Sequence, residues 1–333
     1  MTSTSTQAIL LRSARSRSEN PWVTFALRRG GLFVLSVAVL VIASFLMIHL
    51  VPGDPVRSAL GMNAPVEQVE ALREKLGLNL PLHEQFLAYV GGLFSGDLGT
   101  SMITGEPVAH IIATRLPATL QLAVLAVVLV LLFSVPFGAT MAVLTRNGKN
   151  KALEMGFATV SIVLAAIPEF LLAVTLVYVF AMELWWLPVA GNNAPLSIVL
   201  PVIALALGPI AVFSRIVRVE VLAVLNKDFI RTARAKRLRP HRIYVRHALP
   251  NAMTATLTLT GLLLGGMVAG TVLIENVFAW PGLGSMIVSS ILTKDYFVVQ
   301  AIVLVYGMGV LIVNLGVDVL LALLDPRSTI REA

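Results

Sequence analysis

The stretch RTARAKRLRPHRIYVRHALPNA, residues 231–252, places seven Arg or Lys side chains together in a chain that is otherwise strongly apolar. Of the 333 residues, 57% are hydrophobic and 13% are charged, and the mean hydropathy is +0.87. A chain of this composition is too apolar to hide its surface in one water-soluble core, which is typical of a membrane protein. We therefore expect the basic stretch to lie outside the lipid, between two membrane-spanning segments.

Four apolar segments precede this stretch and two follow it, and each of the six is long enough to cross a bilayer. A spanning helix requires roughly 20 mostly apolar residues. Because lipid provides no hydrogen-bond partners, Leu-, Val- and Ala-rich segments of this length favour helices over the alternating strands of a barrel. We predict an all-α membrane protein with six transmembrane helices, near residues 30–51, 118–144, 155–182, 198–217, 251–274 and 298–324.

The distribution of positive charge predicts the orientation of these helices. Of the 25 Lys and Arg residues, 20 lie in the N-terminal tail, the loop after the second span, the segment 215–246 and the C-terminal tail. Short loops rich in Lys and Arg remain on the cytoplasmic side, so both termini are predicted to be cytoplasmic. The same rule accounts for the net charge of +7, and binding of nucleic acid is not predicted.

The predicted spans organise the chain into a membrane domain with two tails. Residues 1–27 are rich in Ser, Thr and Arg and are expected to be a disordered cytoplasmic tail. Residues 28–328 form the transmembrane domain, and residues 329–333 form a short cytoplasmic tail. Residues 52–117 are the large extracytoplasmic loop, which we expect to be a small cap rather than an independent domain.

Two helices are predicted within this cap. Pro65 is placed to start the first helix and Gly77 to end it, and the segment LHEQFLAYV, residues 82–90, follows as a second amphipathic helix.

The basic loop, residues 226–250, is predicted to form a helix, a turn and a second helix. Pro240 disfavours helical geometry at Arg239 but suits the first turn of a new helix. Attraction to anionic lipid headgroups would by itself explain a basic loop beside a membrane, so membrane lipid is an expected partner. The pattern is more specific than charge, however, because small residues at 232, 233 and 235 are followed at a fixed distance by HALPN, residues 247–251.

This pattern resembles the cytoplasmic coupling loop of permease subunits from binding-protein-dependent ABC importers, in the variant of the dipeptide, oligopeptide and nickel branch. Other segments are similar to the B-type permease of that branch, and the resemblance extends over roughly residues 28–327. The segments are VPGDPV (51–56), GDLGTSM (96–102), RLPATLQLA (115–123), ENVFAWPGLGSMI (275–287) and DVLLALLDPR (318–327).

The resemblance implies a coupling helix that docks on a cytoplasmic ATPase subunit. It also implies a second homologous permease subunit, two ATPase subunits, an extracytoplasmic solute-binding protein and the import of peptides or related solutes across a bacterial or archaeal plasma membrane. Arg237 departs from the family pattern, since Gly usually stands there, and Arg in a left-handed turn costs on the order of 1 kcal/mol. The implied coupling residues are Arg231, Thr232, Ala233, Ala235, Arg237, Leu238, Leu249 and Pro250.

Signatures of enzymes are absent from the sequence. It contains no Gly-x4-Gly-Lys-Ser/Thr phosphate loop, so ATP and Mg are expected in the partner ATPase subunits. The five histidines lack metal-ligand spacing and there is no cysteine, so we expect no catalytic residue, cofactor or metal in this chain. The alternative is a secondary transporter driven by an ion gradient, although the two halves of the sequence show no repeat.

Two polar positions within the predicted spans are candidates for the translocation path. Glu169 follows Pro168 in the centre of the third span, where a bare carboxylate in lipid would cost about 2.5 kcal/mol or more. It either lines the path and meets a substrate ammonium group, or forms a structural hydrogen bond with a neighbouring helix. Asn314 lies one turn above Asp318 in the last span, and this pair fits either helix packing, which we favour, or the inner end of the path.

Overall fold

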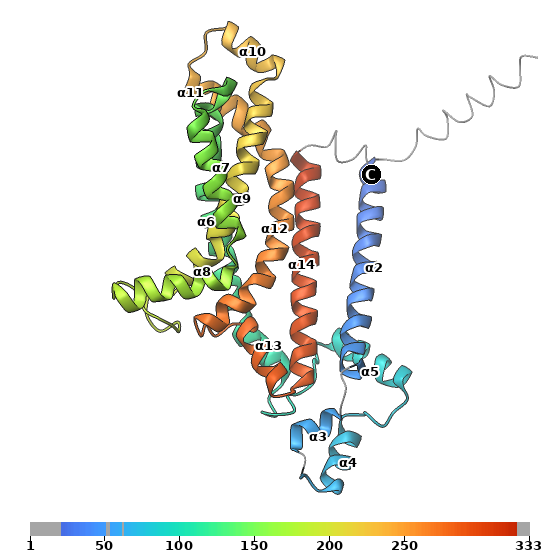
Figure 1. Ribbon diagram of the computed structural model, residues 1–333. Helices are drawn as coiled ribbons and strands as arrows, with labels where there is room; N and C mark the ends of the chain where they lie inside the picture. Colours follow the sequence, from blue (N-terminus) through green and yellow to red (C-terminus); the bar gives the residue numbers. More distant parts are fainter. Residues whose placement is uncertain (1–20, 51–53, 62, 325–333) are drawn as a thin grey trace, which may run out of the picture.

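The chain folds into an elongated bundle of helices (Figure 1). The computed structural model describes residues 21–50, 54–61 and 63–324, and this part of the chain contains no strand. Four of its helices are long and apolar enough to cross a membrane. The prediction of an all-α membrane protein is therefore confirmed. These four helices are α2 (Pro21–Leu50), α6 (Val108–Leu144), α9 (Val199–Leu225) and α14 (Tyr296–Leu324).

The predicted third span is not a single straight helix. α7 (Lys151–Ala166) is followed by α8 (Glu169–Leu176) and the π-helical η2 (Val177–Glu183), and the chain bends by 94° between them. Proline lacks an N–H group and disfavours helical geometry in the preceding residue, so the helix breaks at Pro168. In Figure 1, α8 projects sideways from the bundle.

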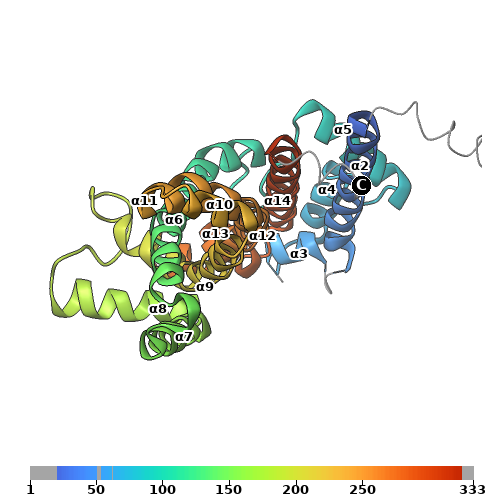
Figure 2. The same cartoon turned by 90° about the horizontal axis from the view of Figure 1, so that it is seen from above.

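The remaining long helix is α12 (Leu249–Val277), whose 29 residues run beside α14. It corresponds to the predicted fifth span, but because the third span is bent, the count of six crossings stays a prediction. Figure 2 shows α14 between α12 and α2.

Two predicted boundaries were wrong. Residues 21–27, assigned to a disordered tail, form the first turns of α2. Residues 108–117, assigned to the extracytoplasmic loop, form the first turns of α6, in which Pro117 is accommodated. The rest of the predicted tails, residues 1–20 and 329–333, lies outside the described residues.

Buried apolar side chains hold the central helices together. Leu122 of α6, Leu205 and Phe213 of α9 and Ile274 of α12 belong to one cluster and are almost completely inaccessible to solvent. Each such side chain contributes about 1.5–3 kcal/mol when it is removed from water. For side chains within the membrane, the helices are instead held together by close packing and interhelical hydrogen bonds, since lipid is as apolar as leucine.

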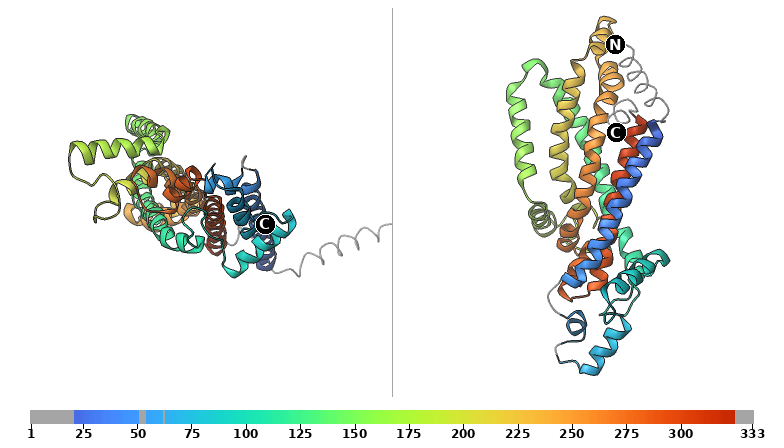
Figure 3. Two further views of the ribbon diagram at one scale, coloured as in Figure 1. Left: turned by 90° about the horizontal axis from the view of Figure 1, so that it is seen from below. Right: turned by 90° about the vertical axis from the view of Figure 1, so that its right-hand side faces the viewer.

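The predicted cap helices are present at one end of the bundle. They are α4 (Val66–Lys75) and α5 (Leu82–Ser95), and a short helix that was not predicted, α3 (Pro55–Leu60), precedes them. Gly77 has φ of +67° and ends α4 as predicted, because the N–H of Leu78 bonds to the carbonyl of Arg73 at 3.0 Å. The basic loop lies at the opposite end, where α2 begins and α14 ends (Figures 1 and 3).

Candidate functional site

The basic loop folds into a short, well-terminated helix. α10 (Asp228–Ala235) is closed by a Schellman turn, in which the N–H of Leu238 bonds to the Ala233 carbonyl at 3.3 Å and that of Arg237 to the Arg234 carbonyl at 2.8 Å. Arg237 has φ of +56°, the left-handed conformation that the usual Gly would adopt most easily. The turn therefore keeps the geometry expected of a Gly position despite the arginine.

Replacing Arg237 with Gly is expected to stabilise the chain by roughly 0.5–1 kcal/mol, because it removes the strain of a left-handed L-residue. The free energy of unfolding in detergent would measure this. Arg239→Gly is the matched control, since Arg239 has φ of −59° and gains nothing from Gly. Equal destabilisation by both substitutions would contradict the prediction.

α10 presents two different faces. Ile230 is completely buried and Ala233 is 8% exposed, and both pack on the ends of α6 and α9 in a cluster that includes Ala142, Val221 and Leu225. The prediction placed Ala233 on the docking surface, but its side chain faces its own subunit. Of the other predicted coupling residues, Leu238 and Leu249 are half-buried against this cluster, while Arg231, Thr232, Ala235, Arg237 and Pro250 are exposed.

The loop is continuous with a membrane helix. α11 (Pro240–Arg242) starts at Pro240 as predicted and runs into the π-helical η3 (Ile243–Ala248), which joins α12 directly. Ile243 and Ala248 are buried in the cluster beneath α10. α10 therefore packs on the residues that lead into α12, and the helical backbone is continuous from Pro240 through η3 into α12. Figure 2 shows α10 and α11 above the ends of α6, α9 and α12.

Two arginines that the sequence analysis did not assign fix the base of this loop. Arg218 of α9 donates to Glu154 of α7 at 2.5 Å and to the hydroxyl of Thr145 at 3.0 Å. Arg146 donates to the carbonyl of Leu225, the last residue of α9, at 3.1 Å. The ends of α6, α7 and α9 are therefore held as one platform. Only the positive charge of these residues was evident from the sequence, because their partners are distant in the chain.

Glu169 is the first residue of α8, immediately after the bend. Its side chain is half-buried and faces α12, where a Cβ at Gly270 would lie 2.5 Å from the Glu169 carboxylate. It thus faces protein, as predicted. α12 lies between α8 and α14 (Figure 1), and no contact described in the structure joins Glu169 to the half-buried Asn314.

Asp318 takes part in helix packing. It forms an ion pair with Arg29 of α2 at 2.9 Å, between half-exposed side chains. This contact joins α14 to α2, which agrees for Asp318 with the favoured interpretation of helix packing. Such a half-exposed pair contributes at most about 1 kcal/mol.

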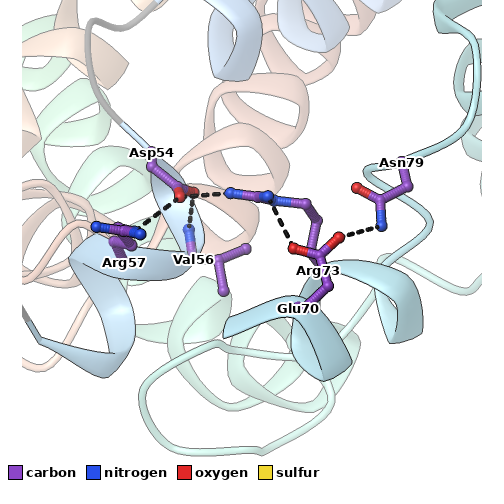
Figure 4. Close-up of polar contacts among 6 residues, drawn as sticks. All are labelled: Asp54, Val56, Arg57, Glu70, Arg73 and Asn79. Carbon is purple, nitrogen blue, oxygen red and sulfur yellow. Dashed lines mark hydrogen bonds and ion pairs between the residues drawn. The ribbon is translucent and has the colours of Figure 1, made fainter. Parts of the chain in front are cut away.

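The cap carries a connected set of charged groups (Figure 4). Asp54 accepts a hydrogen bond from the N–H of Val56 at 3.0 Å and caps α3, while its other oxygen pairs with Arg73 of α4 at 2.6 Å. Arg73 also binds Glu70 at 3.1 Å, and Glu70 accepts from Asn79 at 3.0 Å. Asp54 thereby fixes α3 against α4 and gives the cap a defined shape.

The cap helix α5 is held to the membrane helix α2 by hydrogen bonds. Tyr89 of α5 shares a hydrogen bond with Ser44 at 2.9 Å, and Gln85 bonds to His49 at 3.1 Å. Burial raises the pKa of Tyr89, while hydrogen bonds to Ser44 and Gln300 act in the opposite direction. The tyrosine therefore stays neutral at physiological pH, and its hydrogen bond holds α5 against α2.

Comparison with known protein families gives two matches that together cover most of the chain. Residues 134–330 match the binding-protein-dependent transport system inner membrane component, and residues 22–123 match the N-terminal part of such membrane components. The first match alone covers more than half of the chain.

Individual relatives belong to the same class of transport system. The chain is 38% identical over 295 residues to the glutathione transport system permease protein GsiC of Escherichia coli O6:H1, covering 89% of this chain and 94% of the relative. It is 37% identical to GsiC of Pectobacterium atrosepticum, covering 87% and 94%. A solved structure, the MetNI methionine ABC transporter in an inward-facing conformation, has a similar fold with a TM-score of 0.56 at 17% identity, covering 65% of this chain and 96% of that one.

Proposed function

Since the chain belongs to the family of inner-membrane components of binding-protein-dependent transport systems and is the permease subunit of an ATP-driven ABC importer, we propose that it forms half of a solute path. The other half is a second, homologous permease subunit. Two cytoplasmic ATPase subunits and an extracytoplasmic binding protein complete the importer. The chain spans the plasma membrane several times with both termini in the cytoplasm.

The observation that supports this proposal is that α10 and the residues leading into α12 pack in one buried cluster. Mechanical coupling requires a stiff element that protrudes from the membrane and small side chains where two backbones approach closely. The exposed face of α10, with Arg231, Thr232 and Ala235, has this character. Closure of the ATPase subunits would push on this face, and η3 would pass the movement to α12.

The cap at the other end is the proposed contact for the binding protein. Its ion pairs and its hydrogen bonds to α2 keep it folded without a partner. A preformed surface loses less conformational entropy on binding than a flexible loop does. A solute released there enters the path between the two permeases.

The proposed solutes are small peptides and related compounds. The relatives are named for the transport of glutathione, which is itself a tripeptide. Such solutes carry an ammonium group and carboxylates at neutral pH, and Glu169 is proposed to meet the ammonium group in the path. The half-buried Asn314 is a second candidate for the path, on another helix.

Glu169→Gln is expected to insert and assemble normally but to lower the affinity for a solute that carries an ammonium group by about fivefold to tenfold, because one charge-assisted contact is lost. The concentration dependence of uptake measures this. Glu183→Gln, the same substitution at the exposed carboxylate that ends η2, is the control. An unchanged half-saturation concentration in Glu169→Gln would contradict a contact between this carboxylate and the solute and would indicate a structural role instead.

The experiment that tests the function is purification of the chain in mild detergent, with mass spectrometry of the proteins that accompany it. We expect a second permease and ATPase subunits. Uptake into cells or vesicles should be inhibited by vanadate. Purification of the chain alone, with uptake that collapses when an ionophore removes the proton gradient at constant ATP, would instead support the secondary transporter.

A further inference from the structure

The turn between α12 and α13 (Leu283–Leu292) encloses a carboxylate that the proposed coupling does not use. Glu275 lies near the end of α12 and is completely buried. A buried charge is tolerated only where hydrogen bonds compensate its lost hydration. Glu275 belongs to the segment ENVFAWPGLGSMI, residues 275–287, and nothing near it in the sequence indicates its partners.

The surroundings of Glu275 supply three hydrogen-bond donors. Its Oε1 accepts from the hydroxyl of Thr119 at 2.7 Å, and its Oε2 accepts from the N–H groups of Gly284 at 2.6 Å and Ser285 at 3.0 Å. An ionised carboxylate is purely an acceptor, so this set of donors suits it. The two N–H groups belong to the first turn of α13, where the helix dipole also favours negative charge.

These bonds connect three helices. Thr119 belongs to α6, and its hydroxyl oxygen also accepts from the N–H of Leu283 at 2.8 Å. The indole N–H of Trp280 bonds to the Ala118 carbonyl of α6 at 3.1 Å. Glu275 therefore joins its own helix, α12, to the start of α13 and, through Thr119, to α6.

The glycines of this turn make room for the carboxylate. A Cβ at Gly282 would overlap the Glu275 carboxylate, and one at Gly284 would lie 2.5 Å from Cα of Val272 and 2.9 Å from Oε2 of Glu275. The sequence from Glu275 to Ser285 thus encodes both the buried anion and the space that holds it.

α13 is placed where its orientation matters for transport. Leu283 packs with Ile111 of α6 and Ile302 of α14 in a buried cluster near the extracytoplasmic cap. Its packing joins α6, α13 and α14 at the end of the bundle that carries the cap.

We propose that Glu275 is a positioning residue of the outer gate, which fixes the start of α13 to α6 and α12 so that the three segments move as one body. The proposal rests on the proposed importer function for its effect on transport. The fixed position of α13 itself can be measured on the purified chain without partners.

Two variants separate hydrogen bonding from charge. In Glu275→Gln, the amide oxygen can still accept from Gly284 and Ser285, and the amide N–H can donate to Thr119. In Glu275→Leu, which has a similar volume, all three donors lose their partner. We expect uptake to fall about tenfold in Glu275→Leu and to stay within about threefold of the original in Glu275→Gln.

The position of α13 can be followed with spin labels, because the chain has no cysteine of its own. Cysteines would replace Val124 of α6 and Leu292 of α13, which are 58% and 78% exposed. We expect a narrow distribution of label distances in the original chain and in Glu275→Gln, and a distribution at least about twice as wide in Glu275→Leu.

Unchanged distances and uptake in Glu275→Leu would overturn the proposal, and so would a Glu275→Gln variant as defective as Glu275→Leu. If Glu275→Leu does not fold, Thr119→Val provides the second test with Thr119→Ser as its control, and a narrow distance distribution in Thr119→Val would overturn the proposal. If the label distances change as expected in Glu275→Leu but uptake does not depend on ATP, the importer function is contradicted. The role of Glu275 in fixing the position of α13 is then still supported.

Discussion

Ala235→Glu is expected to abolish the co-purification of ATPase subunits and to reduce uptake at least about tenfold, while the membrane helices still insert. Ala235 is exposed at the end of α10, beside Thr232 and Arg231. A carboxylate that must lose its water at an interface without a partner costs about 1–3 kcal/mol or more, and each 1.4 kcal/mol is a factor of ten in affinity. Co-purification and ATP-dependent uptake are the two measurements.

The matched control is Ala152→Glu. Ala152 is also an exposed alanine, in the first turn of α7 at the same end of the bundle. It receives the same change in size and charge at a position outside α10. Normal assembly of Ala235→Glu, or equal loss of assembly in Ala152→Glu, would contradict docking through α10.

Ala233 would not serve the same purpose, although it is the residue of this helix that matches the general motif literally. Its side chain packs into the cluster beneath α10, so Ala233→Glu would bury a charge within the subunit. Loss of transport in that variant could arise from misfolding of the loop as well as from loss of the ATPase subunits, so it would not distinguish the two. Ala233 is buried against its own subunit and Ala235 is exposed, so the two small residues of this pattern face different surroundings.

Features that depend on local sequence were predictable. The helix end at Gly77 and the start of α11 at Pro240 follow from backbone preferences of a few residues. The left-handed conformation of Arg237 does not follow from its own preference, because it is the one that the family's usual Gly adopts most easily. The apolar segments were long enough to identify the membrane helices, since lipid imposes a minimum length.

Features that depend on contacts between distant residues were not predictable. Glu275 and Thr119 are 156 positions apart in the chain, so nothing near either residue identifies the other. Residues 155–182 were predicted as one span, whereas the chain bends by 94° at Pro168, and this angle depends on how α8 packs against α9 and α12. The same holds for Asp318, whose partner Arg29 lies on the first helix of the chain.

Gly138 is the position within the helices where a substitution is expected to have the largest effect. A Cβ at Gly138 of α6 would overlap the carbonyl of Ser214 in α9 and would lie 2.8 Å from the Cβ of Val217. Neither neighbour is the mobile end of a long side chain, so the two helices must separate. Such overpacking costs typically 1–3 kcal/mol, and we expect Gly138→Ala to lower the free energy of unfolding by that amount.

Gly156→Ala is the control that isolates this effect. Gly156 lies in the middle of the neighbouring helix α7, and a Cβ there would meet no atom within 4 Å. Because alanine favours a helix over glycine by roughly 0.5–1 kcal/mol, this variant is expected to be as stable as the original chain or more stable. Denaturation in detergent should therefore give changes of opposite sign for the same substitution in adjacent helices, and a stabilised Gly138→Ala variant would disprove the close approach.

The effect of Gly138→Ala should extend to the coupling loop. Val217, Val221 and Leu225 follow one another along α9 and form the cluster on which Ile230 and Ala233 of α10 pack. A shift of α9 away from α6 would loosen this support, although α10 itself is unchanged. We therefore expect Gly138→Ala to weaken the retention of ATPase subunits as well as to lower stability, whereas Gly156→Ala should leave retention unaltered. Full retention in a Gly138→Ala variant that is measurably destabilised would mean that α10 holds its position without the α6–α9 platform.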